Sequence, residues 1–167
     1  MAANARVDQI AQQLGVAPLQ SRLLFKMALT TSPGKPTVVG KTPSGSRFIA
    51  GVEGGTVDGI VKGTVIGPAG DWVQQRSDGV NVIDVRLTII TSDTNEAIYM
   101  YYGGYLLPGK AHAELKTKGV MVDAEQVRMS ARFETSSTKY GWLNSVVAVG
   151  RGKAFAGGAN YDVFQLQ

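Results

Sequence analysis

The chain has 167 residues, enough for one domain with a sizeable core and too few for two comfortable ones. It contains no cysteine, which excludes disulfides, thiolate nucleophiles, iron–sulfur clusters and cysteine-based zinc sites. The net charge of +4 comes from Lys and Arg residues that are scattered along the sequence, not concentrated in a stripe with aromatic residues, so we expect no nucleic-acid partner.

No apolar run approaches the roughly 18 to 20 residues that a membrane-spanning helix needs. The amino terminus also lacks the basic-then-apolar pattern of a signal peptide. We therefore expect a cytoplasmic protein with no membrane partner.

A short amphipathic helix is predicted over residues 4–14. Apolar residues recur there at i, i+3, i+4 and i+7 from Val7 to Leu14, and Gly15 follows as a stop signal. We expect residues 1–20 to form a helical extension and residues 21–167 to form a single β-barrel domain.

The remainder of the sequence predicts strands separated by turns. The first strand is expected at residues 22–31, and prolines and glycines then mark a loop up to residue 45. Residues 108–126 are expected to form a loop with one helical turn. Further strands are predicted at residues 46–55, 55–66, 71–77, 80–92, 97–107, 127–136, 142–155 and 161–166.

Consecutive strands with short turns indicate an antiparallel sheet, because each parallel crossover needs about a dozen residues or more. The predicted fold is therefore all-β: an antiparallel β-barrel of about eight strands with a short N-terminal helix. A barrel of this size is either filled by its own side chains or holds one small ligand.

Strand residues alternate between two faces, and several strands carry one apolar and one polar face. In residues 80–90 the odd positions from 83 to 89 are apolar, whereas Asp84 and Arg86 lie among the even positions. In one interpretation the apolar set is the core and the polar set faces water. In the other the polar set lines a cavity, and the sequence leaves both open.

Two features favour the cavity. The polar positions hold Asp, Arg and Glu, and Asp is depleted in strands unless something requires it. Tryptophan and tyrosine residues also lie near these ions in the sequence, and aromatic walls with a few convergent polar groups are typical of small-molecule pockets.

Three segments resemble a family of small bacterial and fungal proteins known only as a domain of unknown function: VGKTPSGSRFIAGVEGGTVDG (39–59), AGDWVQQRSDGVNVIDVRLTIITSD (69–93) and RFETSSTKYGWLNSVVAVGRG (132–152). The resemblance implies a compact barrel, similar to allene oxide cyclase, dirigent and lipocalin-like barrels and commonly oligomeric. The predicted helix departs from the family pattern. The motifs carry over these candidate pocket residues: Asp71, Trp72, Arg76, Asp84, Arg86, Glu134, Tyr140, Trp142 and Asn144.

Several chemistries are disfavoured by the residues present. His112 is the only histidine, and its surroundings are typical of a solvated loop, so a nucleophilic triad is not expected. With one histidine and no cysteine, only an all-oxygen metal site is possible, and no acidic ligand loop is visible. The glycine-rich residues 150–158 lack the following Ser or Thr and helix of a phosphate loop.

Acid–base chemistry remains, so we expect no metal and no cofactor. The favoured hypothesis is an isomerase, cyclase or lyase acting on a hydrophobic or aromatic carbonyl or phenolic compound. A non-catalytic ligand-binding barrel and a structural homo-oligomer are the alternatives, and a homo-oligomer is expected in any case. The predicted catalytic residues are Asp84, Arg86, Glu134 and Tyr140, and the predicted substrate-binding residues are Trp72, Arg76, Tyr101, Arg132, Trp142 and Asn144.

Overall fold

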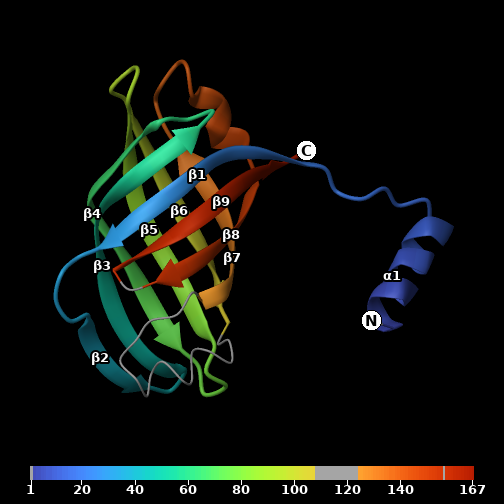
Figure 1. Cartoon of the computed structure of the whole chain (residues 1–167), viewed down its shortest axis with the longest axis horizontal. Helices are drawn as coiled ribbons and strands as arrows, with labels where there is room; N and C mark the ends of the chain where they lie inside the picture. The colour runs from blue at the N-terminus through green and yellow to red at the C-terminus, as the bar shows by residue number, and fades with distance from the viewer. Residues whose placement is uncertain (1, 108–123, 156) are drawn as a thin grey trace.

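The structure is a computed structural model that describes residues 2–107, 124–155 and 157–167. Eight antiparallel strands close a barrel and a ninth is added to it, which confirms the predicted fold class (Figure 1). From β3 to β9 each strand pairs with the next, and β1 closes the barrel by pairing with both β9 and β3. The strands are β1 (Ser21–Thr31), β2 (Thr37–Thr42), β3 (Gly45–Gly59), β4 (Gly63–Gln75), β5 (Asn81–Thr91), β6 (Ala97–Leu106), β7 (Ala124–Glu134), β8 (Ala148–Phe155) and β9 (Gly158–Leu166).

The apolar faces of the strands point into the barrel. Along β5, Ile83, Val85, Leu87 and Ile89 are all buried, whereas Arg86 between them is exposed. Of the two orientations that the sequence left open, the structure has the one in which the apolar set forms the core. Burial of these branched side chains supplies the main driving force for closing the sheet.

One end of the barrel is packed solid. Phe25 and Phe133 meet there edge to face, with their ring centroids 6.1 Å apart. A 3₁₀ helix, η1 (Gly141–Ser145), lies over this end, and its Leu143 is only 1% exposed. Figure 1 shows η1 at the end of the barrel opposite β2.

Some boundaries differ from the predictions. Strand β2 occupies part of the expected loop, and the predicted strand 55–66 is divided between the end of β3 and the start of β4. The predicted strand 71–77 is the second half of β4, and the predicted strand 142–155 begins with η1. Residues 108–123 of the predicted loop lie outside the described residues, and residues 124–126 belong to β7.

The predicted N-terminal helix is present as α1 (Ala2–Gln13) and lies away from the barrel wall (Figure 1). Its apolar residues Val7 and Ile10 are exposed, as is Leu14 just after it. The division between an extension over residues 1–20 and a barrel domain over 21–167 stays a prediction. In the part of the chain that the structure describes, none of the helices combines the length and the apolar character needed to cross a membrane.

Candidate functional site

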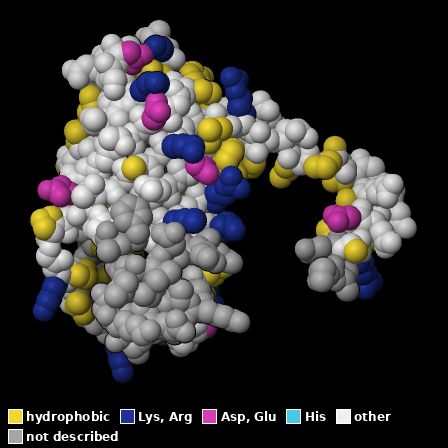
Figure 2. Space-filling view, in the orientation of Figure 1, with side chains coloured by type: hydrophobic (Ala, Val, Ile, Leu, Met, Phe, Trp, Pro, Cys, Tyr) yellow, Lys and Arg dark blue, Asp and Glu magenta, His cyan; other side chains and the backbone are white. Residues whose placement is uncertain are grey.

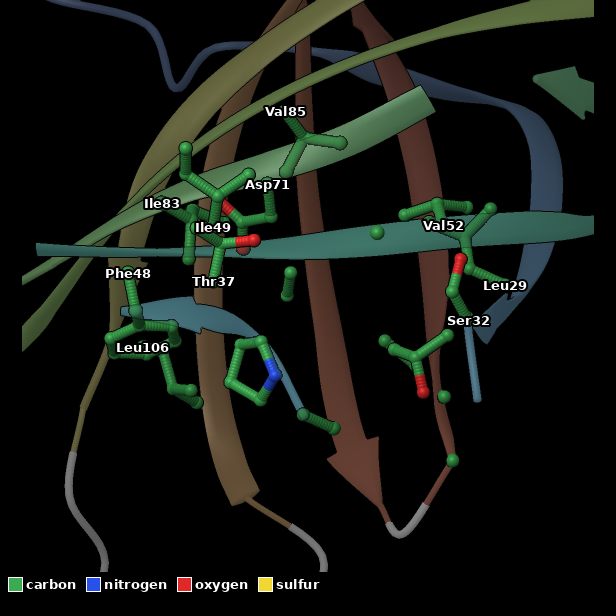
Figure 3. A pocket seen from close by; sticks show the side chains of 18 of the residues that line it. Leu29, Ser32, Thr37, Phe48, Ile49, Val52, Asp71, Ile83, Val85 and Leu106 are labelled. Carbon is green, nitrogen blue, oxygen red and sulfur yellow. The ribbon is translucent and has the colours of Figure 1, made fainter. Parts of the chain in front are cut away.

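The barrel end that contains β2 is hollow. A cavity of about 420 Å³ lies there, within the size range of small-molecule sites. It is lined by residues from every strand from β1 to β9, with Thr37 from β2, and by residues 32–36, which connect β1 to β2 (Figure 3).

The wall of this cavity is predominantly apolar. Among its described lining residues only Asp71 and Lys35 carry a charge, and Lys35 is exposed. A cavity with this lining favours an uncharged, largely apolar guest. The apolar side chains of the wall include Leu29, Phe48, Ile49, Val52, Ile83, Val85, Leu106 and Val127.

Strand β4 places Asp71 in the cavity. Asp71 shares its strand face with the buried Val73, and the β4–β5 register sets it opposite Val85. Figure 3 shows its carboxyl group among the side chains of Ile49, Ile83 and Val85. The carboxylate oxygen Oδ1 accepts a hydrogen bond of 2.9 Å from the backbone N–H of Asp84, which fixes the orientation of the group.

Burial raises the pKa of Asp71 from 3.8 to about 6. The backbone N–H of Asp84 and the guanidinium of Arg47 lower this pKa, and the negative charge of Asp84 raises it, but removal from water is the largest cause. A carboxyl group with a pKa near 6 is ionised at neutral pH and still takes up a proton readily. These are the properties of a general base.

Two buried tyrosines, Tyr102 and Tyr161, also line the cavity. The hydroxyl of Tyr102 is buried and has no hydrogen-bond partner among the described residues. A ligand whose oxygen accepts a hydrogen bond from this hydroxyl is therefore favoured there. Its ring meets that of Tyr161 edge to face, with centroids 5.4 Å apart. Burial, with a smaller contribution from the charge of Asp71, raises the pKa of Tyr161 to about 12. Burial, followed by the neighbouring Tyr161 phenol and then the charge of Asp71, raises the pKa of Tyr102 well above 10. Both phenols are therefore protonated donors at neutral pH.

Four of the predicted site residues do come together, but on the outer wall of the barrel. Arg86 pairs with Asp84 at 2.9 Å. The Arg86 guanidinium also lies 5.3 Å from the Trp72 ring centroid and 5.0 Å from that of Tyr101. The expected cluster exists, and it faces away from the cavity because the apolar positions of β5 face inward.

Three further predicted residues are also on the outside. Arg132 and Glu134 are exposed along β7, on the face opposite the buried Phe133. Arg76 is paired at 2.5 Å with Asp78 in the turn between β4 and β5. None of these three lines the cavity.

The remaining predicted residues belong to η1 and the loop before it. Tyr140 is buried at the packed end, and its hydroxyl donates a 2.9 Å hydrogen bond to Asp93. Asn144 accepts a hydrogen bond from the Thr135 N–H at 2.8 Å and donates one to the Thr135 carbonyl at 2.9 Å. Trp142 is 41% exposed. This dense motif anchors η1 over the packed end.

Asp84, Arg86, Glu134 and Tyr140 thus lie outside the cavity, and a catalytic role for them stays a prediction. The cavity instead presents Asp71, Tyr102 and Tyr161. Asp71 was carried over by the family motif, whereas the two tyrosines were not among the predicted site residues. The sequence does contain a signal for all three. Each is a polar residue two positions along its strand from an inward-facing apolar residue, as Tyr102 is from Met100 and Tyr161 is from Val163.

Fold and site together define a cavity-bearing antiparallel β-barrel. The chain belongs to the family described as Protein of unknown function (DUF3237), whose model matches residues 19–166. It is 28% identical over 145 residues to a UPF0311 protein of Bradyrhizobium diazoefficiens, covering 85% of this chain and 94% of that one.

Solved structures share the fold. A β-barrel-like protein from Acinetobacter baumannii is 29% identical with a TM-score of 0.76, covering 90% of this chain and 98% of that one. A crystal structure described as that of an enzyme from Penicillium herquei is 24% identical with a TM-score of 0.67, over 90% of this chain and 96% of that one. The second likeness establishes the fold alone.

Proposed function

We propose that the protein is a cofactor-independent enzyme that moves a proton within an uncharged, hydrophobic or aromatic carbonyl or phenolic compound, as an isomerase, a cyclase or a lyase. The observation that carries the proposal is a single carboxyl group, Asp71, held in a cavity of about 420 Å³ with its pKa raised to about 6. A protein with the same fold, from Penicillium herquei, is described as an enzyme.

Asp71 is the base in this proposal. Its Oδ1 is engaged by the Asp84 N–H, which leaves the second oxygen for the proton of the substrate. Asp71 removes a proton from the α-carbon of a ketone or from a phenol, and the electron pair of the broken bond moves toward the substrate oxygen. In an isomerisation, Asp71 returns the proton to another carbon of the substrate. In a cyclisation, the anion attacks a conjugated double bond, the π electrons of that bond move to its far carbon, and Asp71 returns the proton there. In a lyase reaction, the electron pair of the anion expels a leaving group from the β-carbon, and that group takes the proton from Asp71.

Tyr102 is the donor that meets the developing negative charge. Its unpartnered hydroxyl gains a hydrogen bond when substrate oxygen becomes enolate or phenolate, so the interaction is stronger in the transition state than in the ground state. Tyr161 holds the Tyr102 ring through the edge-to-face contact. The apolar wall excludes water that would otherwise solvate Asp71.

The test begins with a panel of enolisable aryl ketones and hydroxylated aromatic ketones, screened for binding by ligand-observed NMR. Each bound compound is then incubated with protein in D₂O, and deuterium uptake at its α-carbon is followed. We expect catalysed exchange by the wild type, none by Asp71→Asn, and loss of binding in Ala159→Phe, which fills the cavity. Binding that Ala159→Phe abolishes, without exchange by the wild type, would identify a non-catalytic ligand-binding barrel instead.

A further inference from the structure

A second hollow, on the outside of the barrel wall, is unusually basic. It has a volume of about 290 Å³ and crosses β7, β8 and β9. We call it the basic groove. Figure 2 shows Lys and Arg side chains gathered over the neighbouring part of the surface, where β1, β9 and β8 face the viewer. The outward side chains that line the groove come from Arg128, Arg151, Lys153, Asn160 and Asp162.

Positive charge predominates in this groove. Arg128 and Arg151 are direct cross-strand partners, and like charges in such positions repel. The single carboxylate, Asp162, lies 3.4 Å from Arg151 and is shared with Lys26 at 4.0 Å. Within the described residues Arg128 forms no ion pair with a carboxylate.

The same geometry suits a tetrahedral oxyanion. Side chains of directly opposed residues begin about 5 Å apart, so two guanidinium forks on neighbouring strands can converge on one phosphate group. Lys153 and Asn160 are also cross-strand partners and add an ammonium and an amide donor beside them. A bound phosphate replaces the repulsion between Arg128 and Arg151 by two charge-assisted interactions.

The groove also adjoins an aromatic surface. Tyr105 is paired with Arg128 across β6 and β7, and it is 49% exposed. Its ring offers a face on which a planar group attached to a phosphate can stack. A second copy of the chain is not favoured as the occupant, because its own groove carries the same positive charge.

We propose that the basic groove binds the phosphate group of a small phosphorylated compound, with Arg128 and Arg151 as the principal ligands. Asp162 acts against the anion, since it carries negative charge and competes for Arg151. Tyr161 belongs to the walls of both hollows, but its ring packs on Tyr102 inside the barrel, and Asp71 does not line the groove, so this proposal does not depend on the proposed acid–base function.

The test is calorimetric titration of the full chain with inorganic pyrophosphate at about 50 mM salt, where charge interactions are weakly screened. We expect saturable binding that Arg128→Ala and Arg151→Ala each weaken at least tenfold, and that Arg151→Lys weakens less. Asp162→Asn should strengthen binding severalfold. The control is Arg76→Ala, which removes an exposed arginine that is likewise paired with a nearby Asp, and it should stay within twofold of wild type.

Two further ligands identify the source of the phosphate. Tighter binding of adenosine monophosphate than of inorganic phosphate supports a nucleotide-like ligand stacked near Tyr105, and equal affinity supports recognition of the phosphate group alone. The proposal is overturned if pyrophosphate fails to bind at millimolar concentration, or if Arg76→Ala weakens binding as much as Arg151→Ala does. Affinity that appears only with oligonucleotides and grows with their length also overturns it. Unfolding midpoints confirm that the variants are folded.

Discussion

Asp71 and Asp84 are joined by a hydrogen bond in which the Asp84 backbone N–H donates to the Asp71 side chain at 2.9 Å. The two side chains lie on opposite sides of the barrel wall: Asp71 lines the cavity, and Asp84 pairs outside with Arg86. Asp84 therefore supports the buried carboxyl through its backbone and not through its side chain.

Stability should depend on pH through Asp71. The folded-state pKa of about 6 is higher than the ordinary value of 3.8, so the folded chain binds the proton more tightly than the unfolded chain does. The free energy of unfolding should therefore decrease as pH rises from about 4 through 6, by up to about 3 kcal/mol from this group. Urea unfolding of wild type and Asp71→Asn at pH 5 and pH 8 measures about half of this change, about 1.4 kcal/mol, because part of the contribution of Asp71 is already lost at pH 5. A difference between the two pH values that is equally large in Asp71→Asn contradicts the assignment.

Proton transfer should distinguish the two aspartates. Asp71→Asn is expected to lower the rate of deuterium exchange at least 10²-fold, which is the usual contribution of a general base. Asp84→Asn keeps the backbone N–H and should change the rate less than about threefold, with the midpoint of the pH–rate profile shifted downward because a negative charge near Asp71 is gone. Equal losses in both variants would show that the outer pair takes part in the chemistry.

Tyr102 and Tyr140 are both buried, and they should respond in opposite ways to the loss of their hydroxyl groups. Tyr102→Phe removes a hydroxyl without a partner among the described residues, so the free energy of unfolding should stay within about 1 kcal/mol of wild type or rise. Exchange activity should fall because the donor is lost. Tyr140→Phe breaks the hydrogen bond to Asp93 and should lower the urea midpoint without affecting activity. The opposite pattern would assign the structural role to Tyr102.

The motif around η1 should prove structural. Leu143→Ala opens a cavity at the packed end and is expected to cost about 2–5 kcal/mol of unfolding free energy. The adjacent Trp142→Ala is the control: its side chain is 41% exposed, and the cost should be clearly smaller. If the Trp142 variant binds ligand more weakly and its stability is unchanged, Trp142 belongs to the binding site.

The fold could largely be predicted from the sequence, because alternation and turn residues determine strands directly. Strand β2 was missed because Gly40 and the surrounding prolines suggest a loop. These residues are compatible with a strand here because β2 pairs with β3 along one side alone. The break between β3 and β4 was missed because apolar residues such as Ile60 and Val61 continue through the turn.

The site was harder to predict for a physical reason. Alternation divides the residues of a strand between two faces, but it does not show which face lies inside the barrel. The family motif includes Asp71, but it does not show which way the Asp71 side chain points. The density of polar residues pointed to the outer cluster around Arg86 and to the η1 anchor. The cavity depends instead on single polar residues, Asp71 and Tyr102, among apolar neighbours. Such isolated residues give a weak signal in one sequence.

Titration of Asp71 itself tests most directly whether the cavity holds a buried general base. The ¹³Cγ resonance, assigned by its absence in Asp71→Asn, should be followed between about pH 2 and pH 9 in the folded protein. We predict a midpoint of about 6 for Asp71. Asp93 serves as an internal contrast, because hydrogen bonds from Lys139 and Tyr140 lower its pKa to about 2. A midpoint for Asp71 at or below 3.8 would contradict a buried general base in the cavity.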